Sequence, residues 1–470
     1  MKKLKKLMAV TLSALLAASA LTACKASDDE SNSSSKKSNS SSSSDVDSKT
    51  NSDEEIYFLN FKPEIAEIYE EIAEVYKEET GVTVKVNTAA SGTYEQTLKS
   101  EIAKTDAPVI FQINGPVGYE SWKDYCLDLK DTEIYQHLTD KSLAVTSGDG
   151  VYGIPYVVEG YGIIYNDEIM QKYFALSEKT VSISSAEEIK DFNTLKAVVE
   201  DMTANKDELG IKGVFASTSL IPGEDWRWQT HLLNLPMYME FKENTSFDNT
   251  ILAGLDSKEI NFKYSDNFKN IFDLYINNSI TDKALLGSKS VDDSMAEFAL
   301  GNVAMVQNGN WAWSQINGVD GNVTTSENIK FLPIYTGSES DSSQGLCVGT
   351  ENYLAINKNV SESKQKAAAD FLNWLFSSEK GKDYVTNKLG FIAPFDTFSD
   401  DEKPSDPLAR ELLSWMEKDG VTSIPWAFAS FPSQEFKDNV GAALLEYVQG
   451  SKSWDDVVST TKDQWKNEKS

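Results

Sequence analysis

The stretch IYFLNFKPEIAEIYEEIAEVYKEETGVTVKV, residues 56–86, decides how the globular part of this chain begins. Its first four residues are apolar and read as a buried strand, and Pro63 then favours the first turn of a helix. Apolar residues recur at helical spacing until Gly81, a common helix stop. The valines of 82–86 alternate with other residues, which predicts a second strand.

The alternation of strands and helices continues downstream. Thr93 and Gln96 have the spacing of a capping box for a second helix, and residues 109–113 read as a third strand. The order β-α-β-α-β predicts the α/β class, with a parallel sheet covered on both faces. Ligands of such sheets bind beyond the carboxyl ends of the strands, which fall here at 60–62, 89–92 and 112–115.

The rest of the chain shows no internal repeat and no further Ser-rich linker. Two extended runs, 153–159 and 161–166, are followed by several helical patterns, and Ser453 with Asp456 can cap the last of them. Because no linker separates one half from the other, two domains must be interwoven, with the chain crossing between them more than once.

Charge and composition exclude several classes of function. Among 470 residues, Lys and Arg number 44 and Asp and Glu 73, which gives a net charge of -29. A nucleic-acid binder needs a basic face, and docking on anionic lipid needs positive charge, so both are disfavoured. Hydrophobic residues make up 40% of the chain, which excludes a wholly disordered protein.

Motifs for cofactors and metals are missing from the sequence. No Gly-rich nucleotide loop and no G-x-S-x-G elbow occurs. The two histidines, His137 and His231, exclude a His-rich metal site. Cys126 and Cys347 have no second Cys or His at metal-ligand spacing, so we expect two buried thiols. A disulfide between these two stays open as an alternative.

The first 55 residues indicate where the protein works. Residues 1–23 have a lysine-rich start, a short apolar run and small residues before Cys24, which is typical of a secretory signal. The ending Leu-Thr-Ala-Cys resembles a bacterial lipobox, whose cysteine receives a diacylglyceryl group; an ordinary cleaved signal is the alternative. Residues 24–55 are rich in Ser, Asn and Asp and read as a flexible tether. We therefore expect a cell-surface protein, lipid-anchored to the outer face of the cytoplasmic membrane.

Two Trp-x-Trp pairs, at 226–228 and 311–313, are the most informative side chains. Residues two apart on a helix point to nearly opposite sides, so one member of each pair is expected in the core and the other at a cleft. Core positions for both are the alternative. Arg227 stands inside the first pair and can hold a carboxylate, stack on a ring or bridge to a nearby acid. Aromatic faces with carboxylates suit either sugars or organic cations.

Three blocks of the sequence resemble the extracellular solute-binding proteins of ABC transporters, in the maltose/oligosaccharide-binding branch (family 1). Residues 152–159, YGIPYVVE, continue into Tyr-Asn at 165–166, and residues 349–356 lead into a helical stretch at 364–381. The most specific block is MAEFALGNVAMVQNGNWAW, residues 295–313. The resemblance extends over nearly all of residues 56–470.

The resemblance implies a two-lobed periplasmic-binding-protein type II fold with a hinge between the lobes. We expect the N-terminal lobe at 56–158 and 330–395, and the C-terminal lobe at 159–329 and 396–470. It also implies a monomeric receptor that passes an oligosaccharide to the transmembrane subunits of a permease, with no catalysis and no cofactor.

Candidate ligand-binding residues follow from positions in these motifs. Glu159 and Trp311 lead, then Trp226 with its acidic neighbour Glu224, then Lys62 in the first strand-to-helix loop. A loop near the C-terminus resembles one that supplies a stacking aromatic, either Trp426 or Phe431. Arg227, Gln112 and Asn114 complete the set.

The third strand departs from the pattern of the maltodextrin binders. That branch has Trp and then Asp-Arg after this strand, whereas Gln112 and Asn114 stand here. Amides can also bind hydroxyl groups, so other oligosaccharides stay open as ligands. Two other functions also stay open: a surface glycoside hydrolase using Glu159 and Glu224, whose carboxylates would need to lie about 5–10 Å apart, and a binder of polyamines or other organic cations.

Overall fold

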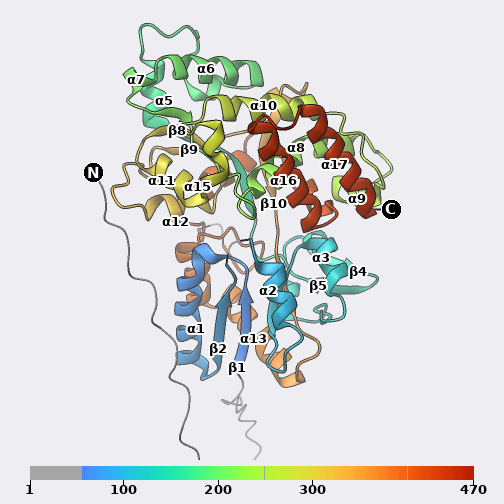
Figure 1. The fold of residues 1–470 in the computed structure, drawn as a ribbon. Helices are drawn as coiled ribbons and strands as arrows, with labels where there is room; N and C mark the ends of the chain where they lie inside the picture. The colour runs from blue at the N-terminus through green and yellow to red at the C-terminus, as the bar shows by residue number, and fades with distance from the viewer. Residues whose placement is uncertain (1–54, 91, 248, 400, 470) are drawn as a thin grey trace, which may run out of the picture. The chain divides into compact units, whose positions relative to one another are not determined.

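The computed structural model describes residues 55–469 except 91, 248 and 400 (Figure 1). The signal, Cys24 and all but the last residue of the tether lie outside the described residues. The described chain forms two α/β lobes, each built on its own sheet.

The first lobe contains a four-stranded sheet in the order β11-β3-β1-β2. Both β2 and β3 run parallel to β1, which confirms the β-α-β-α-β prediction. The fourth strand, β11, comes from far along the chain and pairs with β3 in the antiparallel direction. The bounds are β1 Glu55–Asn60, β2 Thr83–Thr88, β3 Ile110–Ile113 and β11 Tyr353–Ile356.

Local sequence explains where the first helices begin and end. Pro63 opens a short 3-10 turn that leads into α1, Ala66–Thr80, and Gly81 ends this helix with a left-handed φ of 78°. Helix α2 spans Tyr94–Glu101, but the predicted capping box is wrong. The Thr93 hydroxyl donates to the carbonyl of Ala90 instead, so it is not available to the helix.

The second lobe contains a larger sheet in the order β12-β10-β6-β8-β7, and β9 also pairs with β6. All eight residues of the central strand β6 are buried. The bounds are β6 Glu159–Asn166, β7 Gly213–Phe215, β8 Val303–Gly309, β9 Ile329–Leu332, β10 Gln344–Gly349 and β12 Thr422–Pro425.

The remaining elements cover these sheets or link them. At the last helix the predicted capping box is confirmed, because Ser453 and Asp456 bond reciprocally to each other's backbone N–H. The elements are α3 Gly115–Trp122, α4 Glu133–His137, β4 Val145–Ser147, β5 Gly150–Gly153, α5 Asp167–Phe174, α6 Phe192–Ala204, α7 Lys206–Leu209, α8 Asn234–Lys242, α9 Thr250–Asp256, α10 Ser265–Asn277, α11 Val291–Ala299, α12 Ala312–Asn317, α13 Glu362–Ser377, α14 Glu379–Asp383, α15 Pro407–Met416, α16 Gln434–Val448 and α17 Trp454–Lys469.

Two of the segments that cross between the lobes run side by side. Ile154 pairs with Leu354 on one side of the crossing, and Glu159 pairs with Gly349 on the other, in one continuous antiparallel register. Between these pairs Pro155 has no N–H to donate, and Asn352 adopts a φ of 62°. The hydrogen-bond ladder of the two crossing segments is therefore interrupted between the lobes, at a place where a hinge can bend.

The segment around residues 330–349 differs from the expected division of the chain. The sequence predicts that residues from 330 onward belong to the N-terminal lobe. In the structure, both β9 and β10 pair with β6 in the larger sheet. A third crossing follows after Ile392, which forms a bridge with Val158, and leads to α15.

Cys126 and Cys347 are buried free thiols, so the open disulfide alternative is not formed. Cys126 lies in the core of the first lobe and Cys347 in that of the second. Among the described residues, no helix is long and apolar enough to cross a membrane.

Two glycines of β6 give a test of how tightly the larger sheet is packed. A Cβ added at Gly162 would lie 2.5 Å from the backbone oxygen of Leu332, whereas one at Gly160 would mainly meet the side chain of Leu412. Because a side chain can rotate and a sheet backbone cannot, Gly162→Ala should lower the free energy of unfolding by about 1–3 kcal/mol and Gly160→Ala by less. Urea unfolding measures both, and the reverse order would contradict this packing.

Candidate ligand-binding site

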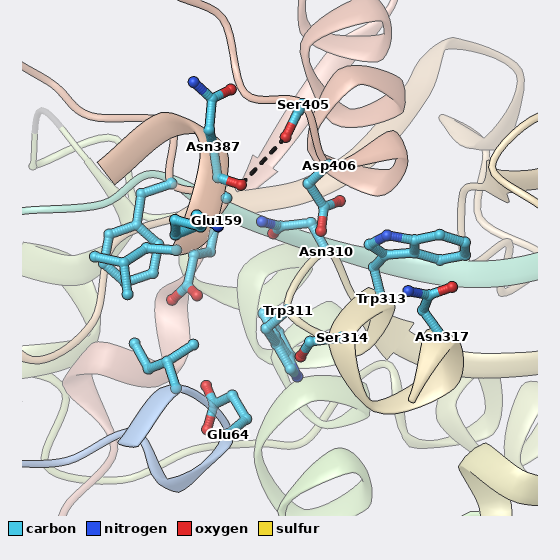
Figure 2. A pocket seen from close by; sticks show the side chains of 15 residues that line it. Glu64, Glu159, Asn310, Trp311, Trp313, Ser314, Asn317, Asn387, Ser405 and Asp406 are labelled. Atoms are coloured by element: carbon cyan, nitrogen blue, oxygen red, sulfur yellow. Dashed lines mark hydrogen bonds between the residues drawn. The ribbon is translucent and has the colours of Figure 1, made fainter. Parts of the chain in front are cut away.

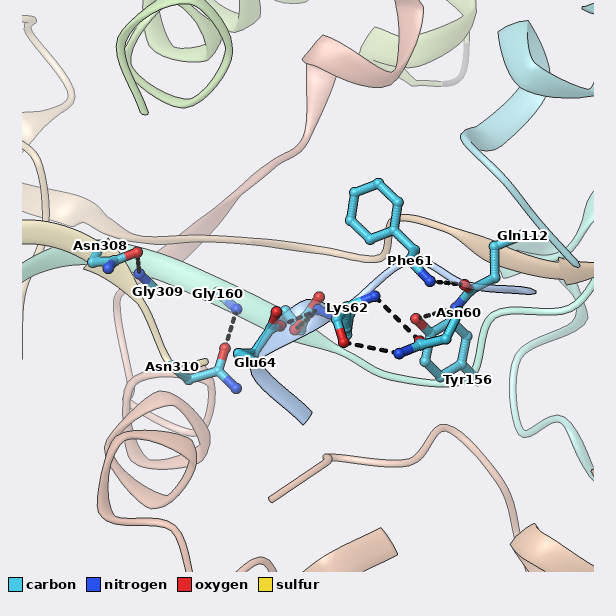
Figure 3. A network of polar contacts seen from close by, with 11 residues as sticks. Asn60, Phe61, Lys62, Glu64, Gln112, Tyr156, Gly160, Asn308, Gly309 and Asn310 are labelled. Atoms are coloured by element: carbon cyan, nitrogen blue, oxygen red, sulfur yellow. Dashed lines mark hydrogen bonds and ion pairs between the residues drawn. The ribbon is translucent and has the colours of Figure 1, made fainter. Parts of the chain in front are cut away.

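A buried ion pair joins the two lobes. The Lys62 Nζ lies 2.7 Å from the Glu159 Oε1, and the side chains are only 6% and 4% exposed (Figure 3). Lys62 follows β1 of the first lobe, and Glu159 opens β6 of the second. A second carboxylate, Glu64, lies 3.6 Å from the same nitrogen. Both predicted residues therefore meet at the junction of the lobes.

The pKa of Lys62 reflects this environment. Burial alone would lower the pKa of the Lys62 ammonium, but the charges of Glu159 and Glu64 outweigh burial and raise it above the ordinary value. Lys62 is thus fully charged at neutral pH. This part of the site therefore holds one cation between two carboxylates, and Lys62 balances the charge of only one of them.

Amide side chains hold the Lys62 loop in place. Asn60 donates through Nδ2 to the carbonyl of Lys62 and accepts through Oδ1 from its N–H, at 2.8 and 3.1 Å. The Gln112 Oε1 accepts from the backbone N–H of Phe61 at 2.6 Å, and its Nε2 donates to the Tyr156 hydroxyl at 2.7 Å. Both polar ends of Gln112 are therefore engaged in shaping the loop.

Asn114 and Glu351 form a second contact near the crossing. The Asn114 Nδ2 donates to the Glu351 Oε1 at 3.1 Å. Burial raises the pKa of the Glu351 carboxyl, against the lowering effect of the Lys437 and Lys62 charges. The charges of Lys62 and Glu159 therefore act on Glu351, the bonding partner of Asn114, which the sequence did not single out.

An aromatic cluster adjoins the ion pair. The Lys62 Nζ lies 5.9 Å from the centre of the Trp311 ring, and Trp226 lies 6.0 Å from Trp311 between ring centres. His231 contacts both tryptophans and stacks on Tyr161 at 4.2 Å. Burial lowers the pKa of His231 well below its usual value, so this ring is neutral.

The two Trp-x-Trp pairs behave differently. In the first pair the core member is confirmed, because Trp228 is buried and donates to backbone carbonyls; Trp226 is half-buried, and its place at a cleft stays a prediction. In the second pair it is wrong, because Trp311 and Trp313 are both half-buried and line one cavity. Trp311 precedes the first turn of α12 rather than lying within it, so the helical spacing does not apply.

This cavity between the lobes has a volume of about 230 Å³ (Figure 2). It is smaller than the roughly 300–1,000 Å³ of typical small-molecule sites. The first lobe, the second lobe and the third crossing all contribute to its walls. Its lining residues are Glu64, Ile65, Glu159, Asn310, Trp311, Trp313, Ser314, Asn317, Asn387, Lys388, Leu389, Gly390, Phe391, Ser405 and Asp406.

The small volume agrees with lobes that are in close contact. A Cβ added at Gly92, in the loop after β2, would lie 2.6 Å from the backbone oxygen of Gly223 in the second lobe. Two backbones can approach this closely only where side chains are absent. The Gly92–Gly223 contact and the Lys62–Glu159 pair therefore both connect the lobes in this conformation.

Other predicted residues lie at varying distances from the ion pair. Trp426 is buried in the aromatic cluster, 5.8 Å from Tyr161 between ring centres. Phe431 instead packs on Phe436 and Trp465 in the core of the second lobe. Of the two alternatives for a stacking aromatic, only Trp426 belongs to the cluster.

Glu224 and Arg227 have distinct surroundings. The Glu224 Oε2 accepts from the backbone N–H of Val291 at 2.7 Å, at the start of α11. Arg227 lies on the ring of Trp226, with its Cζ 3.9 Å from the ring centre, and no described acid forms an ion pair with it. The alternative of a local Arg–Glu bridge is therefore not formed.

Sequence reasoning missed several residues of the site. Glu64 lies two positions after Lys62 and Asn310 one position before Trp311, so proximity in sequence to these two predicted residues was the signal for both. His231 gave a signal only by being rare. Asp406 had a local signal, since an acid before Pro407 is typical of a helix start, but nothing in the sequence connects it with Trp313 across the cavity.

The comparisons with known proteins agree with this geometry. Residues 71–411 match the family model of the bacterial extracellular solute-binding proteins. The chain belongs to this family. No curated protein matches its sequence. Among the described residues of this solute-binding protein, no group of three or more His, Cys, Asp or Glu could hold a metal ion.

Solved structures share the fold of this solute-binding protein. A chitin oligosaccharide binding protein has a TM-score of 0.66 at 16% identity, covering 88% of this chain and 98% of its own. RafE of Streptococcus pneumoniae in complex with raffinose has 0.66 at 17%, covering 88% and 100%. A sugar transporter protein of Bacillus licheniformis in complex with stachyose has 0.61 at 15%, covering 88% and 99%. At identities this low, the structural similarity shows that this chain has the same two-lobed fold and nothing more.

Asp406 in the cavity wall gives a pH-dependent test. Burial raises its pKa to about 6, against the bonds from backbone N–H groups of α15 and the Arg410 charge. A carboxyl whose pKa is higher in the folded state contributes stability that is full below pH 4 and is lost as pH rises through 6. Asp406→Asn keeps a good helix cap and removes this loss, so it should be more stable than the wild type by about 1–3 kcal/mol at pH 8.

Urea unfolding at pH 4, 6 and 8 measures the effect of this substitution. The two proteins should differ little at pH 4 after allowance for the cap, and the gap should open between about pH 4 and 6 and level off above pH 7. Stability curves that stay parallel over this range would show that Asp406 does not titrate as its burial requires.

Proposed function

We propose that this solute-binding protein binds an oligosaccharide in the cavity between its lobes. One observation carries the proposal: two tryptophan rings, Trp311 and Trp313, share a single interlobe cavity with amides and carboxylates. Sugar rings present C–H faces that pack on aromatic rings and hydroxyl groups that bond to amides and acids. The chitin oligosaccharide, raffinose and stachyose named for structures of the same fold support a carbohydrate ligand.

The roles of the individual residues follow from their contacts. Trp311 offers a ring face, and Glu159 offers a carboxylate whose charge Lys62 already balances. Trp226 and Trp426 extend the aromatic surface around His231. Glu224 bonds to the start of α11 and Asn114 to Glu351, so both can contact sugar only at the edges of the site. Gln112 supports the Lys62 loop, and Phe431 supports the core beneath Trp426, rather than contacting sugar directly.

Ligand binding is coupled to closure of the lobes. The ladder between the two crossing segments is interrupted at Pro155 and Asn352, so bending there costs few hydrogen bonds. A ligand that contacts both lobes shifts the population toward the closed state by its extra contacts there. We assign residues 56–158 and 350–395 to the first lobe and residues 159–349 and 396–470 to the second, because β9 and β10 pair in the larger sheet.

The site favours binding over catalysis. A glycosidase needs one free acid and one free base or nucleophile. Glu159 is paired with Lys62, and Glu224 accepts a bond from the start of α11, so both candidates for a hydrolase are engaged. The polyamine alternative is disfavoured because the cations Lys62 and Arg227 already occupy the neighbourhood of these acids.

The protein works outside the cell, as its family does, and we propose that it is a monomer anchored through Cys24. The lysine-rich signal, the Leu-Thr-Ala-Cys ending and the Ser-rich tether support lipid attachment. Attachment at Cys24 would keep the folded part near the membrane, where it can deliver its sugar to the transmembrane subunits of an ABC permease.

Replacing Trp311 by alanine tests the site. A thermal-shift screen of oligosaccharides and polyamines first identifies the ligand, since a ligand that binds the folded state raises the melting temperature. Trp311→Ala should then weaken sugar binding about 10- to 100-fold by calorimetry, because an aromatic face is lost. Trp374→Ala is the matched control, as this half-buried tryptophan packs on the first lobe beside Tyr76 and bonds Glu79.

Three outcomes would contradict the proposed function. These are stabilisation by polyamines but by no sugar, unchanged sugar affinity in Trp311→Ala, and release of hydrolysed sugar by the purified protein.

Replacing Cys24 by serine tests the anchor. The wild type should sediment with membranes, and Cys24→Ser should be released into the soluble fraction because serine cannot carry the thioether-linked lipid. Cys126→Ala, which removes a buried thiol of the folded part, should remain with the membranes. Membrane association of Cys24→Ser equal to that of the wild type would exclude Cys24 as the anchor.

A further inference from the structure

Arg227 is a buried cation whose hydrogen-bonding capacity is largely unused. It is one of only two arginines in the chain, and its side chain is 2% exposed. Within the described residues, its Nε and Nη1 have no hydrogen-bond partner. Two of the three guanidinium nitrogens therefore lack an acceptor.

The contacts that Arg227 makes do not supply hydrogen-bond acceptors for these nitrogens. Its guanidinium lies on the ring of Trp226 at 3.9 Å, which stabilises the charge through the ring face. The N–H groups of a guanidinium point outward in its own plane, so a ring below them cannot accept their bonds. Burying a charge without acceptors is costly, which makes this position unfavourable unless something completes it.

Neighbouring acids do not accept hydrogen bonds from the Arg227 guanidinium either. The charges that act most on Arg227 are those of Glu224, Glu64 and Asp292, but none forms an ion pair with it. Glu224 is bonded to the backbone of Val291, and Glu64 lies beside Lys62. Arg227 therefore has no direct ion-pair partner among the described acids, although the charges of these acids act on it from a distance.

Arg227 does not itself line the cavity, but its stacking partner lies next to a ring that does. Its stacking partner Trp226 is 6.0 Å from Trp311, whose ring lines the cavity wall. Glu64, whose charge acts on Arg227, lines the same cavity from the other lobe. A ligand that extends from Trp311 past Trp226 would bring an anionic group to the unpaired guanidinium.

We propose that Arg227 binds a carboxylate of the ligand, so that the ligand is an acidic oligosaccharide that carries a uronate. This rests on the proposed function, that the cavity binds sugar. A carboxylate matches the planar donors of arginine and also balances its charge, whereas a neutral hydroxyl does only the first. The net charge of -29 does not oppose it, because charges on the distant surface are screened beyond about 8–10 Å at physiological salt.

Matched pairs of sugars test the inference on the wild-type protein. Each pair sets a neutral disaccharide beside the uronate in which its C6 hydroxymethyl group is a carboxylate, for example cellobiose and cellobiuronic acid, and includes galactose- and xylose-based pairs. In the pair that fits the cavity, the uronate should bind at least about tenfold tighter by calorimetry, because bonds to charged groups are the stronger ones. Its affinity should also fall with added salt more steeply than that of the neutral sugar.

Substitutions then locate the effect. Arg227→Gln should weaken uronate binding about 10- to 100-fold and neutral-sugar binding by a clearly smaller factor, since it also removes the cation stacked on Trp226. Arg227→Lys keeps the charge but not the planar donors and should be intermediate. Arg410→Gln is the matched control, since it removes the other arginine at an exposed position and should leave both affinities unchanged.

The outcomes separate this inference from the proposed function. A neutral sugar that binds as tightly as its uronate, or tighter, would overturn the inference and leave sugar binding intact. Loss of both affinities to the same extent in a folded Arg227→Gln would also overturn it. Binding of neither member of any pair would overturn the proposed function, and the inference with it.

Discussion

The buried pair of Lys62 and Glu159 is the constraint on which the rest of the structure depends. It is the point where a loop of the first sheet meets the central strand of the second, and both side chains are almost fully removed from water. Each charge is tolerable there only because of the other, since breaking a buried pair costs about 3–5 kcal/mol. The pair therefore fixes how the β1 loop approaches β6, and with it the position of the cavity walls.

The polar side chains around the pair lie between the apolar cores of the two lobes. The side-chain amides of Asn60 and Gln112 bond to the backbone of the Lys62 loop. The Asn310 Oδ1 accepts from the N–H of Gly160, next to Glu159. The tryptophans close the other side. A cavity with ring faces, amides and carboxylates suits a ligand that is itself apolar on its faces and polar at its edges. That is the description of a sugar ring.

Much of the fold could be predicted from the sequence, because periodicity and helix ends are local signals. The parallel β1–β3 order and the helix stop at Gly81 are examples. Predictions failed where a longer-range contact outweighed a local pattern. Thr93 had the spacing of a cap but bonds to Ala90, and residues 330–349 join the larger sheet because β6 offers them pairing partners. Of the site, Lys62, Glu159, Trp226 and Trp311 could be found, whereas Asp406 and His231 enter through tertiary contacts alone.

The most direct measurement of the central claim is a crystal structure with the oligosaccharide that most raises the melting temperature. The account predicts a sugar ring packed on Trp311 in the interlobe cavity, with its hydroxyl groups bonded to Glu159 and the neighbouring amides and with the Lys62–Glu159 pair intact. A sugar bound outside the cavity, or one that displaces Lys62 from Glu159, would contradict it.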